Sequence, residues 1–316
     1  MRIRLLQTIL AGTALFLSTC STEDVPGEDW DGRLHLSSNV ATLTRATHGL
    51  DTKIAEGQTV WLYIDKASDA SLLYGKELTT IAGNGFSDAD NMTFPANEES
   101  INIYAFHINI KSETTAMATS SYPTGQLTHQ VGNNQKKEGG TYAQSDLLYA
   151  KTTLSKTDAK SRNGAIELPF SHCLSKIEVI LKKSAEVTAS ITKLEILNTK
   201  LEAAFTPSKG NDSWLTLTAS GSETAIEIDN DVTAADGDKL NEAIIIPQTL
   251  SDKTEFIRVT LDGGATLVYK LGAEAKFEKG TKYTYTITAK LTGLTVTSKI
   301  DDWGTSTGAS GDAVME

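Results

Sequence analysis

The sequence predicts an all-β protein with two β-sandwiches in series. Many short segments are rich in β-branched and aromatic residues and are bounded by Gly, Asn, Asp or Ser, which is typical of strands. No segment has a convincing helical repeat longer than about three turns, the usual length of a helix. A polar stretch, residues 155–164, separates two parts that are each near the common size of one domain.

The expected strands follow one another closely along the chain. The clearest alternation places Tyr283, Tyr285, Ile287 and Ala289 on one face, which predicts a half-buried strand of an antiparallel sheet. Residues 111–140 are poor in apolar side chains and are expected to form a long surface loop. The other expected strands cover residues 59–64, 101–108, 146–150, 165–170, 174–181, 190–197, 214–219, 225–228, 243–248, 256–261 and 266–271.

The N-terminus has the features of a secretion signal. Arg2 and Arg4 precede an apolar run, residues 5–17, that is too short to span a bilayer. The run continues into Leu-Ser-Thr-Cys, which resembles the lipobox of bacterial lipoproteins, so we expect Cys20 to be acylated. The alternative is an ordinary signal peptide with a chance cysteine. If Cys20 carries lipid, Cys173 has no disulfide partner and is interpreted as a small buried hydrophobe.

A short strand pattern follows an acidic tether near the N-terminus. Leu34, Leu36 and Val40 share one strand face, so they can close an open edge of the first sandwich. Burying three such side chains contributes about 5–8 kcal/mol before the cost of ordering them. Arg45 then precedes small residues and a glycine, which suits a loop open to proteases. The alternative is an ordinary charged residue at a strand end.

The sequence offers little evidence for catalysis, cofactors or nucleic-acid binding. A net charge of −11 argues against nucleic acid, because its binding proteins need basic patches. The five histidines are scattered without metal-ligand spacing, and no nucleophile elbow or phosphate loop occurs. The acidic residues 229–238 are interpreted as a solvated loop rather than a calcium site. We therefore expect no enzyme activity, no cofactor and no metal.

Several segments resemble the fimbrillins, the lipoprotein-derived pilins of type V pili in Bacteroidetes. "SSNVATLTRA" is similar to the segment that precedes the first domain in that family, and "YPTGQ…QSDLLYA" fits the first domain. The order of the segments matches the family over nearly the whole chain. The remaining similar segments are "LPFSHCLSKIEVIL", "IIIPQTL", "KYTYTITAKLTGLTV" and "IDDWG", at residues 168–181, 244–250, 282–296 and 300–304.

The resemblance implies two transthyretin-like Greek-key β-sandwiches and export as an outer-membrane lipoprotein that later enters an extracellular fimbrium. In that family an Arg-specific protease removes the N-terminal strand, here between Arg45 and Ala46, and a strand from a neighbouring subunit replaces it. No catalytic site is implied. The expected organisation is a signal peptide, an acylated tether with the removable strand, an N-terminal sandwich and a C-terminal sandwich, over residues 1–19, 20–45, 46–162 and 163–316.

The C-terminal strand pattern is a candidate donor for a neighbour. Leu294, Val296 and Ile300 share one face after Gly293, which can act as a hinge. The alternative is that this segment is simply the last strand of the second sandwich. The favoured hypothesis is a pilin that polymerises with other pilin subunits and serves adhesion and biofilm formation. A tip or accessory subunit, or a monomeric surface lipoprotein that binds glycan or protein, remains as the alternative; no specific receptor is indicated.

Overall fold

The computed structural model describes residues 30–40, 51–87, 89, 91–111, 117–232 and 240–303, and the backbone of residues 312–314. These residues form strands β1 to β19, one short α-helix, α1 (Lys156–Ser161), and three 3₁₀ turns, η1 (Ala82–Asn84), η2 (Ala143–Ser145) and η3 (Ser213–Leu215). The all-β prediction is confirmed. Within the described ranges, no helix has the length and apolar character needed to cross a membrane.

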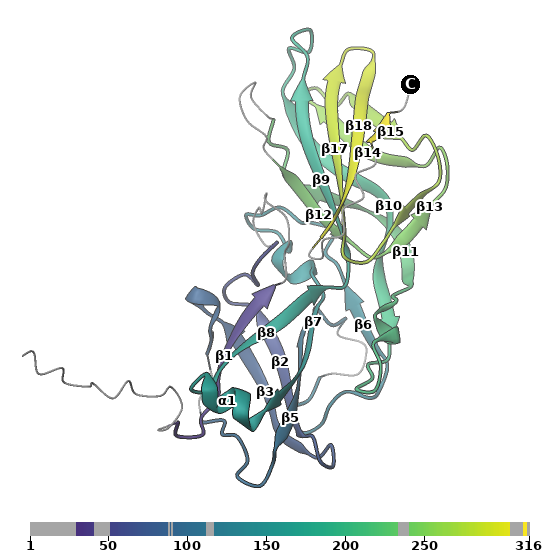
Figure 1. Ribbon diagram of the computed structural model, residues 1–316. Coiled ribbons are helices and arrows are strands. Elements are labelled where there is room, and N and C mark those ends of the chain that lie inside the picture. The colour runs from purple at the N-terminus through teal and green to yellow at the C-terminus, as the bar shows by residue number, and fades with distance from the viewer. Residues whose placement is uncertain are drawn as a thin grey trace, which may run out of the picture.

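Seven strands form one sheet, which occupies the lower half of the molecule in Figure 1. Its order is β1-β8-β7-β5-β2-β3-β4. In β8 every second side chain is buried, which explains the alternation of apolar residues in its sequence. The strands are β1 (His35–Val40), β2 (Thr59–Lys66), β3 (Leu72–Thr80), β4 (Phe86–Ser87), β5 (Ser100–His107), β7 (Leu148–Ser155) and β8 (Ala165–His172).

Two five-stranded sheets and a two-stranded ribbon form the upper half of the molecule in Figure 1. The second sheet has the order β11-β10-β14-β15, and β6 pairs with the C-terminal end of β10. Its strands are β6 (Leu127–Gln130), β10 (Ile191–Phe205), β11 (Ala219–Ile228), β14 (Glu255–Leu261) and β15 (Thr266–Lys270). The third has the order β12-β9-β17-β18-β19 and contains β9 (Ser175–Lys183), β12 (Asn241–Ile245), β17 (Thr281–Lys290), β18 (Gly293–Asp302) and β19 (Asp312–Val314). The ribbon pairs β13 (Gln248–Leu250) with β16 (Ala275–Phe277).

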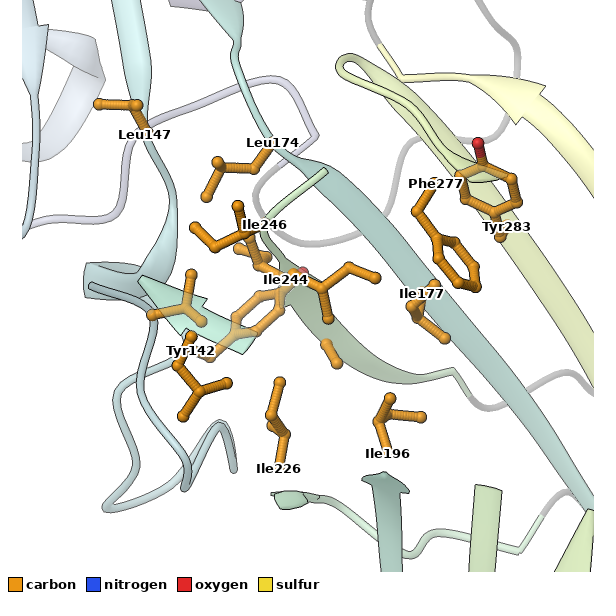
Figure 2. Packing of buried hydrophobic residues seen from close by; sticks show 14 of the residues in the cluster. Tyr142, Leu147, Leu174, Ile177, Ile196, Ile226, Ile244, Ile246, Phe277 and Tyr283 are labelled. Carbon is orange, nitrogen blue, oxygen red and sulfur yellow. The ribbon is translucent and has the colours of Figure 1, made fainter. Parts of the chain in front are cut away.

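Buried apolar side chains form two clusters. The smaller cluster fills the inside of the seven-stranded sheet and includes Leu62 of β2. Its neighbour Tyr63 points to the opposite face and belongs to the larger cluster, which continues between the two upper sheets. Figure 2 shows part of the larger cluster, in which Tyr142 lies beside Ile244 of β12. The two halves therefore share one continuous core.

The chain crosses between the halves more than once. β8 follows the predicted boundary after residue 162 yet pairs with β1 and β7, while β6 precedes that boundary and pairs with β10. α1 occupies the polar stretch, where the Ser155 hydroxyl accepts a hydrogen bond from the Asp158 N–H at 3.0 Å. The division into domains 46–162 and 163–316 stays a prediction.

Two expectations about local structure are wrong. Residues 214–219 were expected to be a strand, but they begin in η3, because Asn211 accepts a hydrogen bond from the Ser213 N–H and starts a turn. Residues 111–140 are not all surface loop, since β6 lies among them and buries Leu127 completely.

The sequence analysis also missed β3. Its apolar alternation is interrupted by Gly75, and in the structure a side-chain carbon at that position would lie 1.9 Å from the Thr119 carbonyl oxygen. A glycine within a strand is typical of such a close approach by another backbone segment.

Candidate functional site

β1 is the strand that closes the first sheet. It runs parallel to β8, beginning with His35 opposite Ala165, and Figure 1 shows the two arrows side by side. On its other side β1 meets the opposite end of the same sheet, since Ser37 forms a bridge with Gly85 next to β4. β1 therefore lies between the two ends of a sheet that curls on itself, and without it both ends would have an unpaired edge.

Backbone hydrogen bonds also hold the segment that leads into β1. The Leu34 N–H donates to the Met92 carbonyl at 2.8 Å, and the Phe94 N–H donates to the Gly32 carbonyl at 2.8 Å. These bonds lie on the side of the N-terminal segment that faces away from β8, so the segment is paired on both sides. Any strand with a free backbone can form bonds of this kind.

The side chains of β1 complete the smaller core. Leu34, Leu36 and Val40, which the sequence places on one face, are 3%, 7% and 1% exposed. If they were withdrawn, an apolar groove would open between β8 and the segment around β4. The side chains of the same cluster that β8 and this segment contribute are Phe86, Met92, Phe94, Ile166, Leu168 and Phe170.

Gly164 allows the start of β1 to approach β8 closely. Its φ of +77° lies in the left-handed region, and its carbonyl accepts a hydrogen bond from the His35 N–H at 2.8 Å. A side-chain carbon here would lie 2.0 Å from the Arg33 carbonyl oxygen and 2.6 Å from Nε1 of Trp30. Only glycine fits this position without moving the N-terminal segment.

The predicted lipid attachment and cleavage positions, Cys20, Arg45 and Ala46, lie outside the described residues. Arg258, by contrast, lies within β14, where its Nε donates to Glu195 Oε2 at 2.7 Å. Strand pairing and this ion pair both shield the Arg258 peptide bond from proteolysis.

The candidate donor strand is paired within its own chain. β18 is in register with β17 from Gly293 opposite Lys290 to its last residue. Leu294 and Val296 are half-buried against the larger core, whereas Ile300 is 42% exposed. The strand therefore belongs to the third sheet in this structure, and its role as a donor stays a prediction.

A buried ionic cluster, which the sequence analysis did not single out, lies on the outer face of the third sheet. Lys176 and Glu178 of β9, Glu242 of β12 and Lys282 of β17 meet Asp51, which precedes β2. Oxygens of the three carboxylates lie within 4.8 Å of one another, as in a cation site. The Lys176 ammonium contacts all three, so it supplies the positive charge that a metal ion would otherwise bring.

Cys173 is a free thiol in the larger core. It is 1% exposed, and burial raises the pKa of the thiol to about 12. The thiol therefore stays protonated at neutral pH and is a poor nucleophile. Its interpretation as a small buried hydrophobe is confirmed.

The fold and the site define an all-β protein whose first sheet is completed by its own N-terminal strand. The chain belongs to the fimbrillin-like family, whose model matches residues 44–303. None of the curated proteins matches the chain.

Two solved structures from Bacteroides share the fold, and a third similar structure comes from Porphyromonas gingivalis. A candidate cell adhesion protein of Bacteroides uniformis is 22% identical, with 86% of this chain and 98% of that chain covered and a TM-score of 0.58. A candidate cell adhesion protein of Bacteroides ovatus is 16% identical, with 87% and 99% covered and a TM-score of 0.60. The tip fimbrial protein Mfa3 from Porphyromonas gingivalis is 11% identical, with 85% and 99% covered and a TM-score of 0.45.

Proposed function

We propose that this protein is a pilin, a subunit of a surface fimbrium that serves cell adhesion and biofilm formation. The chain is exported as an outer-membrane lipoprotein acylated at Cys20 and is later cleaved between Arg45 and Ala46 by an Arg-specific protease. It then joins other pilin subunits outside the cell. Family membership supports the fimbrial role, and the lipobox-like sequence before Cys20 supports the anchor.

The observation that carries the proposal is the position of β1. The strand is paired on both sides and buries Leu34, Leu36 and Val40, yet it belongs to the segment upstream of Arg45. While the chain is intact, β1 competes with any neighbouring strand at an effective concentration that can reach the millimolar range. Cleavage makes it a separate peptide that can dissociate. The groove it leaves offers unpaired backbone and an apolar floor to a strand from another subunit.

β18 is the candidate for that incoming strand. Gly293 has a φ of +141°, which favours glycine, and lies at the turn where β18 would swing away from β17. The alternative is a tip or accessory subunit, which accepts a donor strand without supplying one. The full register of β18 with β17 in its own sheet favours this alternative.

A monomeric glycan-binding lipoprotein has less support. Sugar sites use exposed aromatic rings, but Trp214 and Trp303 are only 8% and 3% exposed. Sheared surface material that runs as a ladder in unboiled SDS gels supports the pilin, whereas a single membrane-retained band supports the monomer.

The test of the proposal is the Arg45→Ala variant beside an Arg162→Ala control, since Arg162 is an exposed arginine within the described residues. We expect Arg45→Ala to accumulate as unpolymerised precursor, and Arg162→Ala to assemble normally. N-terminal sequencing of assembled wild-type material should begin at Ala46, and electron microscopy after Arg-specific proteolysis should reveal filaments. Normal polymers from Arg45→Ala that still carry residues 20–45 would rule out the mechanism.

The lipid anchor is tested separately. Cys20→Ala should abolish membrane attachment.

A further inference from the structure

We propose that the buried ionic cluster around Lys176 anchors the chain just downstream of the cleavage position, so that proteolysis releases β1 and leaves the new N-terminus in place. The inference rests on the proposed function and deepens it by naming the residues that position the processed end. Asp51 stands six residues after Arg45 (51 − 45), so five residues, 46–50, would precede it in the cleaved chain.

Lys176 gathers carboxylates from separate parts of the chain. Its Nζ lies 2.5 Å from Asp51 Oδ1 and 3.2 Å from Glu178 Oε1, and it also contacts Glu242 Oε1. The ammonium group donates a hydrogen bond to Asp51 and forms ion pairs with the carboxylates of Glu178 and Glu242. Burial opposes the charge on Lys176, but the interactions with Tyr142 and with the carboxylates of Glu242, Glu178 and Asp51 outweigh it and raise the pKa well above its ordinary value. The group is therefore a permanent cation for Asp51.

Two further groups bind the same Asp51 carboxylate. Lys282 Nζ of β17 lies 3.5 Å from Oδ2, and the Trp303 indole N–H donates to Oδ1 at 3.1 Å. The Trp303 ring is itself held in place by stacking on His172, with 3.7 Å between ring centroids and 16° between planes. Asp51 is thus bound by β9, by β17 and by the residue that follows β18.

Among the described residues, the formal charges of the cluster balance when Asp51 is present. Three carboxylates face Lys176, Lys282 and, at the exposed rim, Lys137, whose Nζ lies 2.8 Å from Glu242 Oε2. Withdrawing Asp51 would leave an N–H of Lys176 and the indole N–H of Trp303 without this acceptor in a buried site. Buried donors that lose their acceptor are strongly destabilising.

β1 is held by contacts of a different kind. Its backbone hydrogen bonds and apolar side chains can be replaced by those of another strand, whereas the contacts of Asp51 depend on its own carboxylate. Cleavage followed by exchange can therefore remove β1 without disturbing the chain at Asp51.

Two indole groups allow release and anchoring to be followed separately. The Trp30 N–H donates to the Arg33 carbonyl at 2.7 Å within the removable segment, and the Trp303 N–H donates to Asp51 in the anchor. We would label the tryptophans of the full chain with ¹⁵N, add an Arg-specific protease and confirm the cut by mass spectrometry. We expect the Trp30 indole resonance to move to the position of a free peptide while the Trp303 resonance stays unchanged.

The outcomes separate the two proposals. If the Trp303 resonance moves together with that of Trp30, the anchor is overturned although strand release stands. If the chain is cut and neither resonance moves, β1 is retained: strand release fails while the anchor is supported.

A variant of the uncut chain tests the anchor without proteolysis. Asp51→Asn keeps the shape of the side chain but removes its charge, so we expect the Trp303 resonance to shift and the backbone amides of residues 51–58 to exchange hydrogen about tenfold faster or more. Asp252→Asn, at an exposed aspartate in a turn, is the matched control and should change neither. Wild-type exchange rates at residues 51–58 in Asp51→Asn would overturn the proposal even if Arg45 is never cut.

Discussion

His129 of β6 is completely buried and uses both ring nitrogens. The Asn109 N–H donates to Nδ1 at 3.3 Å, so Nε2 carries the proton and donates to the Ser145 carbonyl at 3.0 Å. Burial lowers the pKa of His129 from 6.5 to about 4. The folded chain therefore keeps this histidine neutral over a range of pH in which the unfolded chain protonates it.

We expect His129 to make the protein sensitive to mild acid. As the pH falls from 6.5 to about 4, the unfolded state binds a proton that the folded state excludes, so the free energy of unfolding decreases. A pKa difference of this size corresponds to about 3 kcal/mol. Urea unfolding at several pH values should give a flatter profile for His129→Gln than for wild type. The exposed His35→Gln control should keep the wild-type slope, and a wild-type slope in His129→Gln would contradict the assignment.

Gly164 provides a second prediction. A methyl group there clashes with the Arg33 carbonyl, so Gly164→Ala should displace the start of β1 and lower the free energy of unfolding by about 1–3 kcal/mol. Gly139→Ala is the matched control, because Gly139 also has a positive φ, +70°, but nothing lies within 4 Å of its added carbon. Limited proteolysis should release the N-terminal peptide faster from the first variant alone. If the two substitutions lowered the free energy of unfolding equally, the loss would come from backbone strain and not from the clash with the Arg33 carbonyl.

The sequence could not reveal the ionic cluster. Lys176 and Glu178 alternate with apolar residues in β9, a pattern that is typical of a solvent-exposed face. They are buried because Asp51 and Trp303, far away in the sequence, cover that face. Alternation reports which residues share a face, but it does not report what lies on top of the face.

At the scale of elements, the strands with regular alternation were predictable from the sequence. β8 buries every second side chain, and β17 does so from Tyr283 to Ala289, as their apolar patterns require. The inward face of β1 also follows from its three apolar residues. β6 could not be found in this way, because it has only four residues and its pairing with β10 depends on the tertiary structure.

A disulfide between β17 and β18 tests whether β18 moves. Thr286 and Thr297 are opposite each other in the hairpin, so Thr286→Cys with Thr297→Cys should form a bond that keeps β18 in its own sheet. If β18 is the donor, the oxidised variant stays monomeric after cleavage and polymerises when a reductant is added, as gel ladders would report. Asn102→Cys with Thr153→Cys joins β5 to β7 and is the control, which should polymerise in either state. Polymerisation of the oxidised Thr286–Thr297 variant would exclude β18 as the donor.

At the scale of the whole molecule, a charged contact joins the two halves. Lys209, in the loop after β10, contacts Asp65 of β2, and its Nζ lies 5.6 and 5.0 Å from the ring centroids of Tyr104 and Tyr122. Asp65 is fully buried, so bulk solvent does not reach its carboxylate and Lys209 supplies the compensating charge. Together with the shared apolar core, this contact couples the seven-stranded sheet to the upper sheets.

We expect the molecule to unfold as one cooperative unit. Calorimetry should give a single transition for the wild type, because the larger core extends through both halves. Lys209→Met should lower the free energy of unfolding by about 2–3 kcal/mol, since it leaves a buried carboxylate with no cation. Lys253→Met, at a side chain that is 85% exposed, should have almost no effect. Two separate transitions in the wild type would contradict the coupling.

The parallel pairing of β1 with β8 also determines when β1 can dock as the protein folds. His35 and its partner Ala165 are 130 residues apart (165 − 35), so β1 emerges first during synthesis but cannot pair with β8 until most of the first sheet exists. Contacts between such distant residues form late, because closing a long loop costs entropy before the contact compensates for it. We therefore expect a newly made chain to pass through a state in which most of the sheet is assembled and the edge of β8 is still open. Proteolysis at Arg45, followed by the loss of β1, would therefore restore the open edge of β8 that the folding chain has before β1 docks.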